Sequence, residues 1–338
     1  MNNAHKTGNP VLKLLFATFI LLLVQCEKPA VIPTIFVEKV YTAGTHLSSV
    51  FFIDATSGFA GGNDGILLVT TDGGISWQQA SLQAGEDCDF NCIAFPTRDT
   101  GFASGMENNN SINSGPAIYR TYNGGQSWQF IGGPFDMRFT AFPTKLIGYM
   151  DSYGNGIEKT TDGGQSWNTL SGSPPSSFGY SGLYFATKDL GFLGTSSYPY
   201  RTTNGGTSWS ILSLPSFEYE FNGPTDYDFS DALHGVAVFS RGDIDVTADG
   251  GSTWTNVFDA MNDHYYPLNA VATPSSDFMI AGGINYLAAS ANGVDWEQYY
   301  QQDGTSFPGE VSDIHFYDSQ NGYAVTREGS IYRLKRGN

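Results

Sequence analysis

The sequence repeats one short motif six times, and all six tryptophans of the chain lie in it. The first copy, residues 70–77, reads TTDGGISW, and the fifth, residues 247–254, reads TADGGSTW. The sixth copy, residues 290–296, is one residue shorter. Successive tryptophans are 51, 39, 42, 45 and 42 residues apart. A period in this range is typical of a propeller blade, which is a single sheet of four strands.

A second marker raises the number of repeats to seven. A glycine followed by an aromatic or apolar residue precedes the motif in most repeats, as at Gly58-Phe59, and it appears once more after the last motif at Gly322-Tyr323. Phe278-Met279 takes this place in the sixth repeat. Short alternating runs such as 50–53 and glycine-rich breaks predict strands and turns, and no helical period competes. The sequence therefore predicts an all-β, seven-bladed β-propeller.

The seventh repeat is incomplete at its C-terminal end. Its third strand is predicted at 329–334, and the chain stops at Asn338 before a fourth strand can form. The segment 33–41 is a predicted strand that precedes the first repeat and has no partner there. We predict that this N-terminal strand completes the last blade, because an open ring would leave strand edges unpaired.

The N-terminal segment has the pattern of an export signal. Lys6 and Lys13 precede an apolar run, 14–24, that is too short to span a bilayer as a helix. Cys26 follows, in a setting that resembles a bacterial lipoprotein signal, although Gln25 is not the usual small residue; an ordinary signal peptide cut nearby is the alternative. We therefore divide the chain into a signal peptide, 1–25, a tether, 26–32, and a propeller, 33–338. The expected location is the bacterial cell envelope, in the periplasm or at the outer membrane, with a lipid on Cys26.

Charge excludes one class of partner. The chain has 16 basic and 33 acidic residues, which gives a net charge of −17. Nucleic-acid binding needs a basic surface, so no nucleic acid is expected as a partner. The membrane is expected as a partner through the lipid anchor alone, and the sequence predicts no cofactor.

Two cysteines remain besides Cys26. Cys88 and Cys92 lie in the acidic stretch EDCDFNC. In an oxidising compartment they can form a local disulfide, which is the favoured hypothesis, while free thiols are the alternative. A metal site is disfavoured because neither a histidine cluster nor a second cysteine pair lies nearby.

The acidic or amide residue of each motif looks reactive, but we interpret it as a brace of its own turn. A short carboxylate or amide accepts hydrogen bonds from backbone N–H groups of the turn, while the following glycines adopt positive φ. The tryptophan of each motif is expected to pack between blades. These structural residues are Asp72, Trp77, Asn123, Trp128, Asp162, Trp167, Asn204, Trp209, Asp249, Trp254, Asn292 and Trp296.

The repeated motif resembles the Asp-box, or BNR repeat, of sialidases, some endoglucanases and sortilin-type receptors. With its short blades, the chain is most similar over roughly 33–338 to the photosystem II stability/assembly factor family. That resemblance implies a propeller that acts as a non-enzymatic assembly factor, a role that family members have in the thylakoid lumen. The alternative is a glycoside hydrolase of the sialidase-like class, which would need an arginine cluster beside a carboxylate pair. Three of the eight arginines, Arg120, Arg201 and Arg333, share one repeat position with Lys159, so they indicate architecture.

A binding or scaffolding role is therefore the main functional hypothesis. The longest loops are predicted on the face opposite the Asp-box turns, and they are rich in aromatic and acidic residues. Such a face suits a protein or a glycan partner; the alternative is that the rings only fill gaps between loops. The candidate ligand residues are Phe178, Tyr180, Tyr219, Phe221, Tyr227, His264, Tyr265, Tyr266 and Phe307.

Overall fold

The computed structural model describes most of the region predicted as a propeller, and these residues belong to one compact unit, Val31–Asn338. The described ranges are 33–82, 88–107, 116–131, 139–152, 156–174, 180–195, 198–217, 223–258, 266–299, 301 and 306–337. They form seven antiparallel sheets of four strands each, which confirms the predicted all-β, seven-bladed propeller. The described part of the chain contains no helix long and apolar enough to cross a membrane.

Each blade has the order a-b-c-d from the axis outward. In blades 1 to 7, in this order, the innermost strands a are β2 (Leu47–Phe52), β6 (Cys88–Ala94), β10 (Thr140–Ala141), β14 (Tyr180–Phe185), β18 (Pro224–Phe229), β22 (Leu268–Ser275) and β26 (Val311–Phe316). Strands b are β3 (Gly58–Gly62), β7 (Gly101–Glu107), β11 (Gly148–Ser152), β15 (Gly191–Thr195), β19 (Gly235–Phe239), β23 (Phe278–Gly283) and β27 (Asn321–Thr326).

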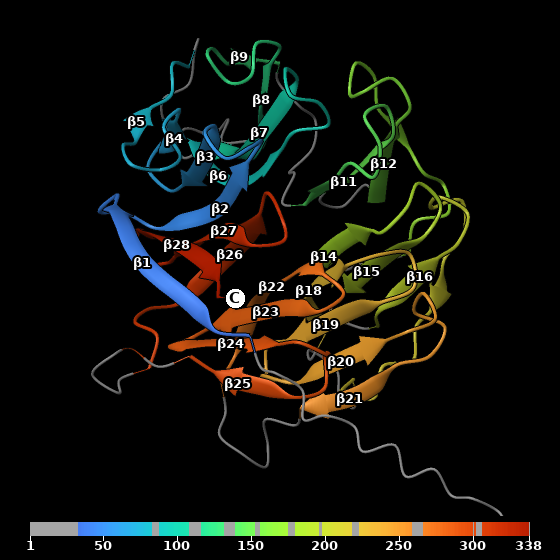
Figure 1. Ribbon diagram of the computed structural model, residues 1–338. Coiled ribbons are helices and arrows are strands. Elements are labelled where there is room, and N and C mark those ends of the chain that lie inside the picture. The colour runs from blue at the N-terminus through green and yellow to red at the C-terminus, as the bar shows by residue number, and fades with distance from the viewer. Residues whose placement is uncertain are drawn as a thin grey trace, which may run out of the picture. The chain divides into compact units, whose positions relative to one another are not determined.

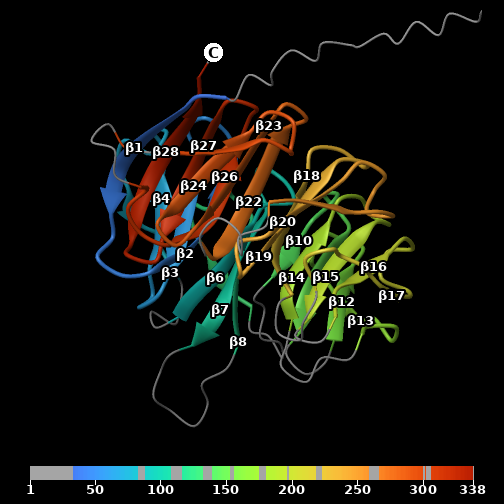
Figure 2. The same ribbon diagram turned by 90° about the horizontal axis from the view of Figure 1, so that it is seen from below.

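In blades 1 to 6 the two outer strands flank the Asp-box turn, whereas in blade 7 they come from the two ends of the propeller. Strands c are β4 (Leu67–Thr70), β8 (Pro116–Thr121), β12 (Gly156–Thr160), β16 (Tyr200–Thr202), β20 (Ile244–Thr247), β24 (Tyr286–Ser290) and β28 (Ser330–Arg336). Strands d are β5 (Gln78–Gln79), β9 (Gln129–Phe130), β13 (Asn168–Thr169), β17 (Ser210–Ile211), β21 (Thr255–Phe258), β25 (Trp296–Gln298) and β1 (Ile35–Thr42). Figure 2 shows one complete blade, β14 to β17, side by side.

The N-terminal strand closes the ring, as the sequence predicts. β1 pairs antiparallel with β28, from Ile35 opposite Arg336 to Thr42 opposite Ser330. Figure 1 shows β1 at the outer edge of the last blade, so the two ends of the propeller meet in one sheet. Closure by main-chain hydrogen bonds leaves the third strand of blade 7 without an exposed edge.

Aromatic rings fill most of the contacts between blades. At the contact of blades 1 and 2, Phe59 of β3 stacks on Phe95, which follows β6, with ring centroids 4.8 Å apart. The edge of Trp128 meets both rings at 5.8 Å. The same set of a strand-b ring, a ring at the end of strand a and an Asp-box tryptophan recurs between blades 2 and 3, 3 and 4, 4 and 5, and 7 and 1. This layer gives the tryptophan of the motif its structural role.

The Asp-box glycines are required by this packing. Gly125 has φ of 80°, and a Cβ atom there would lie 2.2 Å from the ring of Phe59. A larger residue would be strained by its backbone and would also displace the ring. The turn and the aromatic layer therefore depend on each other.

Candidate functional site: the central channel

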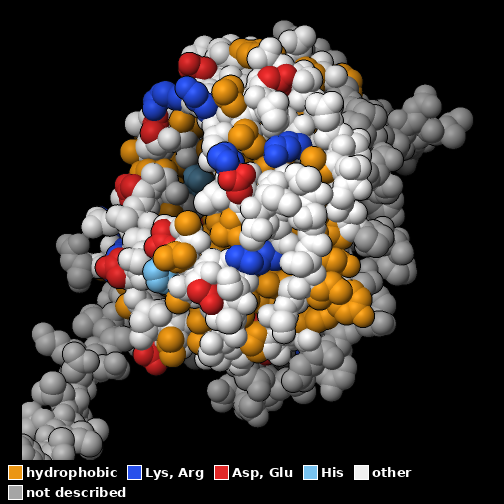
Figure 3. Space-filling view, turned by 90° about the vertical axis from the view of Figure 1, so that its right-hand side faces the viewer, with side chains coloured by type: hydrophobic (Ala, Val, Ile, Leu, Met, Phe, Trp, Pro, Cys, Tyr) orange, Lys and Arg blue, Asp and Glu red, His pale blue; other side chains and the backbone are white. Residues whose placement is uncertain are grey.

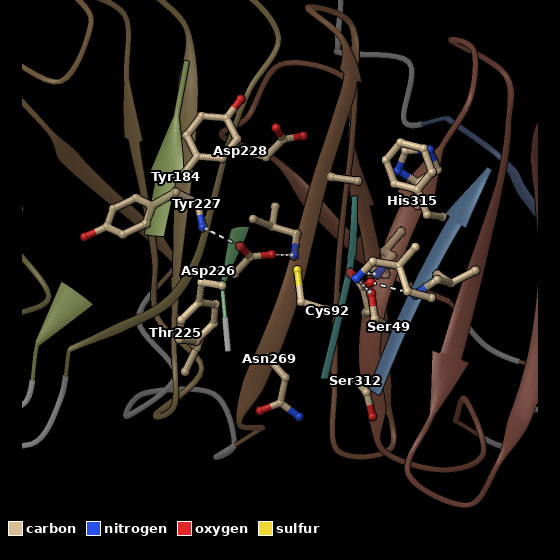
Figure 4. A pocket seen from close by; sticks show the side chains of 18 of the residues that line it. Ser49, Cys92, Tyr184, Thr225, Asp226, Tyr227, Asp228, Asn269, Ser312 and His315 are labelled. Carbon is tan, nitrogen blue, oxygen red and sulfur yellow. Dashed lines mark hydrogen bonds between the residues drawn. The ribbon is translucent and has the colours of Figure 1, made fainter. Parts of the chain in front are cut away.

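The central channel is lined by the innermost strands of all seven blades. It forms a cavity of about 510 Å³. Its polar lining includes three aspartates, Asp226, Asp228 and Asp313, and also Cys92 and His315. Figure 4 shows Asp226 and Asp228 of β18, Cys92 of β6 and His315 of β26 around the channel. Buried acids in a cavity are candidates for chemistry, so their hydrogen bonds decide what the channel can do.

Each innermost strand has one edge that faces the channel and not another strand of its own sheet. The backbone N–H groups on that edge need acceptors. In the following contacts, a side chain from the preceding blade supplies the acceptor. Asp313 Oδ2 accepts from the N–H of Val50 at 2.8 Å, and Asp226 Oδ2 accepts from the N–H of Val271 at 2.9 Å. Ser49 Oγ accepts in the same way from the N–H of Ile93 at 3.2 Å.

A second row of bonds lies two residues further along each strand. Asp228 Oδ2 accepts from the N–H of Thr273 at 2.6 Å and from its hydroxyl at 2.9 Å. The hydroxyl oxygen of Tyr184 accepts from the N–H of Phe229 at 3.1 Å. His315 Nε2 donates to the carbonyl of Phe52 at 3.0 Å. These bonds again run from one blade to the next.

A third row lies where each inner strand begins. The hydroxyl of Thr225 donates to the carbonyl of Leu268 at 2.8 Å, and the amide of Asn269 donates to the carbonyl of Val311 at 3.0 Å. In these three rows, the channel aspartates, the histidine and several neutral polar groups all form hydrogen bonds to the backbone of the next blade. We call these contacts the inter-blade hydrogen bonds.

The electrostatics of the channel follow from burial. Burial raises the pKa of Asp313 to about 6. Burial also raises the pKa of Asp226, and the nearby carboxylates of Asp313 and Asp228 raise it further. Burial lowers the pKa of His315 to about 4, so the ring is neutral at pH 7 and its Nε2–H can donate to Phe52. Among the described residues, no group of three or more His, Cys, Asp or Glu side chains is placed to hold a metal ion.

Three of the predicted ligand rings, Tyr227, Phe307 and Tyr180, are buried, so the prediction that these three form an exposed ligand face is wrong. Tyr227 is 2% exposed and stacks on Phe192; Figure 4 shows its ring pointing away from Asp226. Phe307 is fully buried against Tyr332. Tyr180 is buried and donates its hydroxyl to the carbonyl of Pro174, and Tyr266 is half-buried and stacks on Tyr286. The other candidates, Phe178, Tyr219, Phe221, His264 and Tyr265, lie outside the described residues.

The predicted disulfide between Cys88 and Cys92 is also wrong. Both residues are thiols, and both lie on β6, where the chain is extended. Four residues of strand span roughly 13 Å, which is far beyond the reach of one disulfide. Burial raises the pKa of Cys92 to about 12, and its sulfur accepts from the N–H of Thr140 in the next blade. Cys92 thus takes the place that Asp313 and Asp226 take in their blades. Cys26 lies outside the described residues.

The Asp-box side chains bind their own turns. Asp72 Oδ1 accepts from the N–H groups of Ile75 and Ser76 at 3.0 and 2.9 Å, and Oδ2 accepts from the Ser76 hydroxyl at 2.6 Å. These bonds lower the pKa of Asp72 to about 2. Asp162 and Asp249 make the same bonds. In the other turns Asn123, Asn204 and Asn292 accept through their amide oxygens. Trp77, Trp128 and Trp254 are buried, and Trp167, Trp209 and Trp296 are half-buried.

The basic residues of strand c bind the next Asp-box turn. Arg120 donates to the carbonyls of Gly163 and Gly164 at 3.1 and 3.0 Å. Arg201 and Lys159 donate in the same way to the first glycine of the following turn, and so does Arg333 across the closure from blade 7 to blade 1. None of the residues that line the described channel is an arginine, and Arg138 lies outside the described residues.

Comparison with known proteins agrees with this architecture. Residues 218–338 match the model of a family described as photosynthesis system II assembly factor YCF48. The C-terminal part of the chain thus matches the YCF48 family. This confirms the resemblance predicted from the repeats, and the sequence match covers about the last third of the chain. No curated protein gives a significant match.

Solved structures extend the likeness over most of the chain. YCF48 bound to a D1 peptide is 20% identical, with a TM-score of 0.70 over 89% of this chain and 98% of that one. YCF48 from Cyanidioschyzon merolae is 16% identical, with a TM-score of 0.68 over 88% and 98%. The GH74 xyloglucanase from Xanthomonas campestris is 13% identical, with a TM-score of 0.67 over 88% of this chain and 53% of that one. At these identities the likeness shows the fold alone.

Proposed function

We propose that this chain is a non-enzymatic binding or assembly scaffold that works outside the cytoplasm. In this proposal a lipid on Cys26 holds it in the bacterial cell envelope, and its partner is a protein. The observation that carries the proposal is the use of the channel aspartates. Each of Asp226, Asp228 and Asp313 accepts backbone N–H groups of its own and the next blade, which supports a structural role for the acids that a hydrolase would need.

A protein partner is supported by the comparison with YCF48, one structure of which is bound to a D1 peptide. The distribution of charged side chains also supports a protein partner. Figure 3 shows one side of the molecule, where lysine and arginine side chains stand in small separate groups beside acidic ones. A nucleic-acid partner is disfavoured by the net charge of −17.

A glycoside hydrolase remains the second candidate, because the fold is shared with GH74 enzymes and the channel holds acids with raised pKa values. Against it, a sialidase-like site needs arginines beside its acids, and the described lining of the channel offers none. The acids are also hydrogen-bonded to backbone N–H groups, which leaves few lone pairs for a substrate.

One experiment tests the anchor and the scaffold role together. Cells would express the full-length chain or the Cys26→Ala variant, and membrane fractions would be cross-linked before purification. We expect the wild type in the membrane fraction with a protein partner at fixed stoichiometry, and the variant in the soluble fraction. If Cys26→Ala stays in the membrane fraction as the wild type does, the proposed lipid anchor on Cys26 is wrong. Release of sugar products from a polysaccharide panel, abolished by Asp226→Asn in a variant that still melts normally, would replace the scaffold with the hydrolase.

A further inference from the structure

The contact between blades 5 and 6 differs from the five contacts that share the aromatic set. In those five contacts a ring of strand b and, in four of them, a basic residue of strand c fill the space in front of the next Asp-box turn. In blade 5 these two positions are Val236 and Val246, which pair across β19 and β20. The aromatic residue at the end of strand a is also replaced, since Thr273 stands there in blade 6.

The small side chains leave a pocket on the Asp-box side of this contact. The pocket has a volume of about 310 Å³. Its apolar wall includes Val246, Met279 and Val294, while Ser276 and His234 supply polar groups. Met279 approaches the Asp-box turn: its sulfur lies 3.1 Å from the place of a Cβ on Gly293. The pocket therefore lies where other contacts hold a side chain of the propeller itself.

We propose that this pocket binds the arginine side chain of a protein partner. The chain shows the expected fit at a neighbouring contact. The Arg120 guanidinium donates to two glycine carbonyls of the next turn and lies 5.1 Å over the ring of Phe102, and the side chain is buried. An arginine from outside would place its methylene stem on Val246 and Met279 and its planar group against the turn.

The charges around the pocket favour a cation. Gly293 contributes its carbonyl, which accepts from Trp296 Nε1 at 2.9 Å and keeps a second lone pair. Asp231 does not itself line the pocket, but its carboxylate is 2.9 Å from Nδ1 of His234, which does. Hydrogen bonds from His234 and Leu233 lower the pKa of Asp231 to about 2. This carboxylate is therefore ionised at neutral pH and attracts a basic side chain. The inference rests on the proposed function only in taking the partner to be a protein.

The test uses the full-length chain and a defined probe, the blocked peptide acetyl-Gly-Arg-Gly-amide, in a calorimetric titration. A citrulline peptide of the same shape is the comparison, because it lacks the charge. We expect saturable binding of the arginine peptide and at least tenfold weaker binding of the citrulline peptide. Val246→Arg should abolish binding, since its own side chain then occupies the pocket. Val69→Arg, the same change at the matched position of blade 1, should leave binding unchanged.

Two results would overturn the proposal: equal binding of the two peptides, or normal binding by Val246→Arg. If melting shows that Val246→Arg folds poorly, Ser276→Trp at the exposed rim should block the probe without entering the blade contact. If a variant with a blocked pocket still captures its cellular partner normally, the pocket is not the binding site for that partner. The proposed scaffold role would not be contradicted by that result.

Discussion

At the scale of single residues, one position of the innermost strand decides how neighbouring blades are joined. It holds Asp313 in blade 7, Asp226 in blade 5, Ser49 in blade 1 and Cys92 in blade 2. The residue types differ, yet each side chain accepts the same N–H of the next blade. An acid in this place is favourable as an acceptor and unfavourable as a buried charge, so its contribution to stability depends on pH.

Asp313 gives the clearest pH prediction. Burial raises its pKa to about 6 in the folded chain, above the ordinary value of 3.8, so the folded state binds this proton more tightly. The resulting stability is fully present below about pH 4 and is lost as the pH rises through about 6. The loss is on the order of 3 kcal/mol. We expect that the free energy of unfolding of Asp313→Asn, measured by denaturant titration, lacks this fall between pH 4 and 7.

The matched control is Asp99→Asn, which removes an exposed acid on the Asp-box side. Its unfolding free energy should follow the wild-type pH profile. Parallel profiles for Asp313→Asn and the wild type would show that this carboxyl titrates normally and is not deep in the channel wall.

The tryptophans give a second prediction at this scale. Trp128 is fully buried between Phe59 and Phe95, whereas Trp296 is half-buried at the contact that lacks the aromatic set. Trp128→Ala should cost about 3–5 kcal/mol of unfolding free energy, as is usual for buried aromatic residues. Trp296→Ala should cost less than half of that. Equal costs, measured in parallel denaturant titrations, would mean that the aromatic layer is not what the motif stabilises.

At the scale of elements, the outer strand β1 is the clearest case in which sequence predicted structure. An orphan strand at 33–41 and a missing fourth strand at the C-terminus required each other, and β1 and β28 pair as expected. The loop rings show the opposite. From the sequence, Tyr227 is predicted among the exposed loop residues, but β18 begins at Pro224, so Tyr227 faces the core. The alternation of Tyr227 and Phe229 with Asp226 and Asp228 was the signal that could have placed this strand.

The inter-blade hydrogen bonds could not be predicted in the same way. Repeats reveal a position when its residue recurs, as at the Asp-box. The channel position instead changes from Asp to Ser, Cys, Gly182 and Ala270, because any small acceptor suffices and some contacts use other bonds. Only the assembled ring shows that these dissimilar residues share one task.

Removing β1 tests closure. A chain lacking residues 33–42 loses the partner of β28 and exposes the seven-residue edge of that strand to other molecules. We expect a melting temperature lower by more than 10 °C, or aggregation at room temperature, in light scattering and thermal melts. A chain that begins at Pro33 keeps β1 and is the control. If the shortened chain melts like this control, β1 does not hold the ring together.

At the scale of the whole molecule, two kinds of contact complement each other around the ring. Blades 2, 3 and 4 reach the next Asp-box turn with Arg120, Lys159 and Arg201, whereas blade 5 lacks such a residue and uses Asp226 and Asp228 in the channel. Asp226 and Asp228 therefore stand where the outer contact is weakest, whereas Asp313 stands in blade 7, where Arg333 also reaches the next turn. This distribution is expected of groups that hold blades together.

The most direct test of this central claim is peptide-resolved hydrogen exchange of the full-length protein, read at the amides of Val50, Val271 and Thr273. If Asp313, Asp226 and Asp228 join the blades, these amides are hydrogen-bonded in the free protein. They should then exchange slowly, at a rate set by global unfolding of the protein. Added oligosaccharides should not change these exchange rates. Exchange that is a hundredfold faster in the free protein and slowed by a sugar would contradict the account, since it would mean that the channel acids are free to meet a substrate.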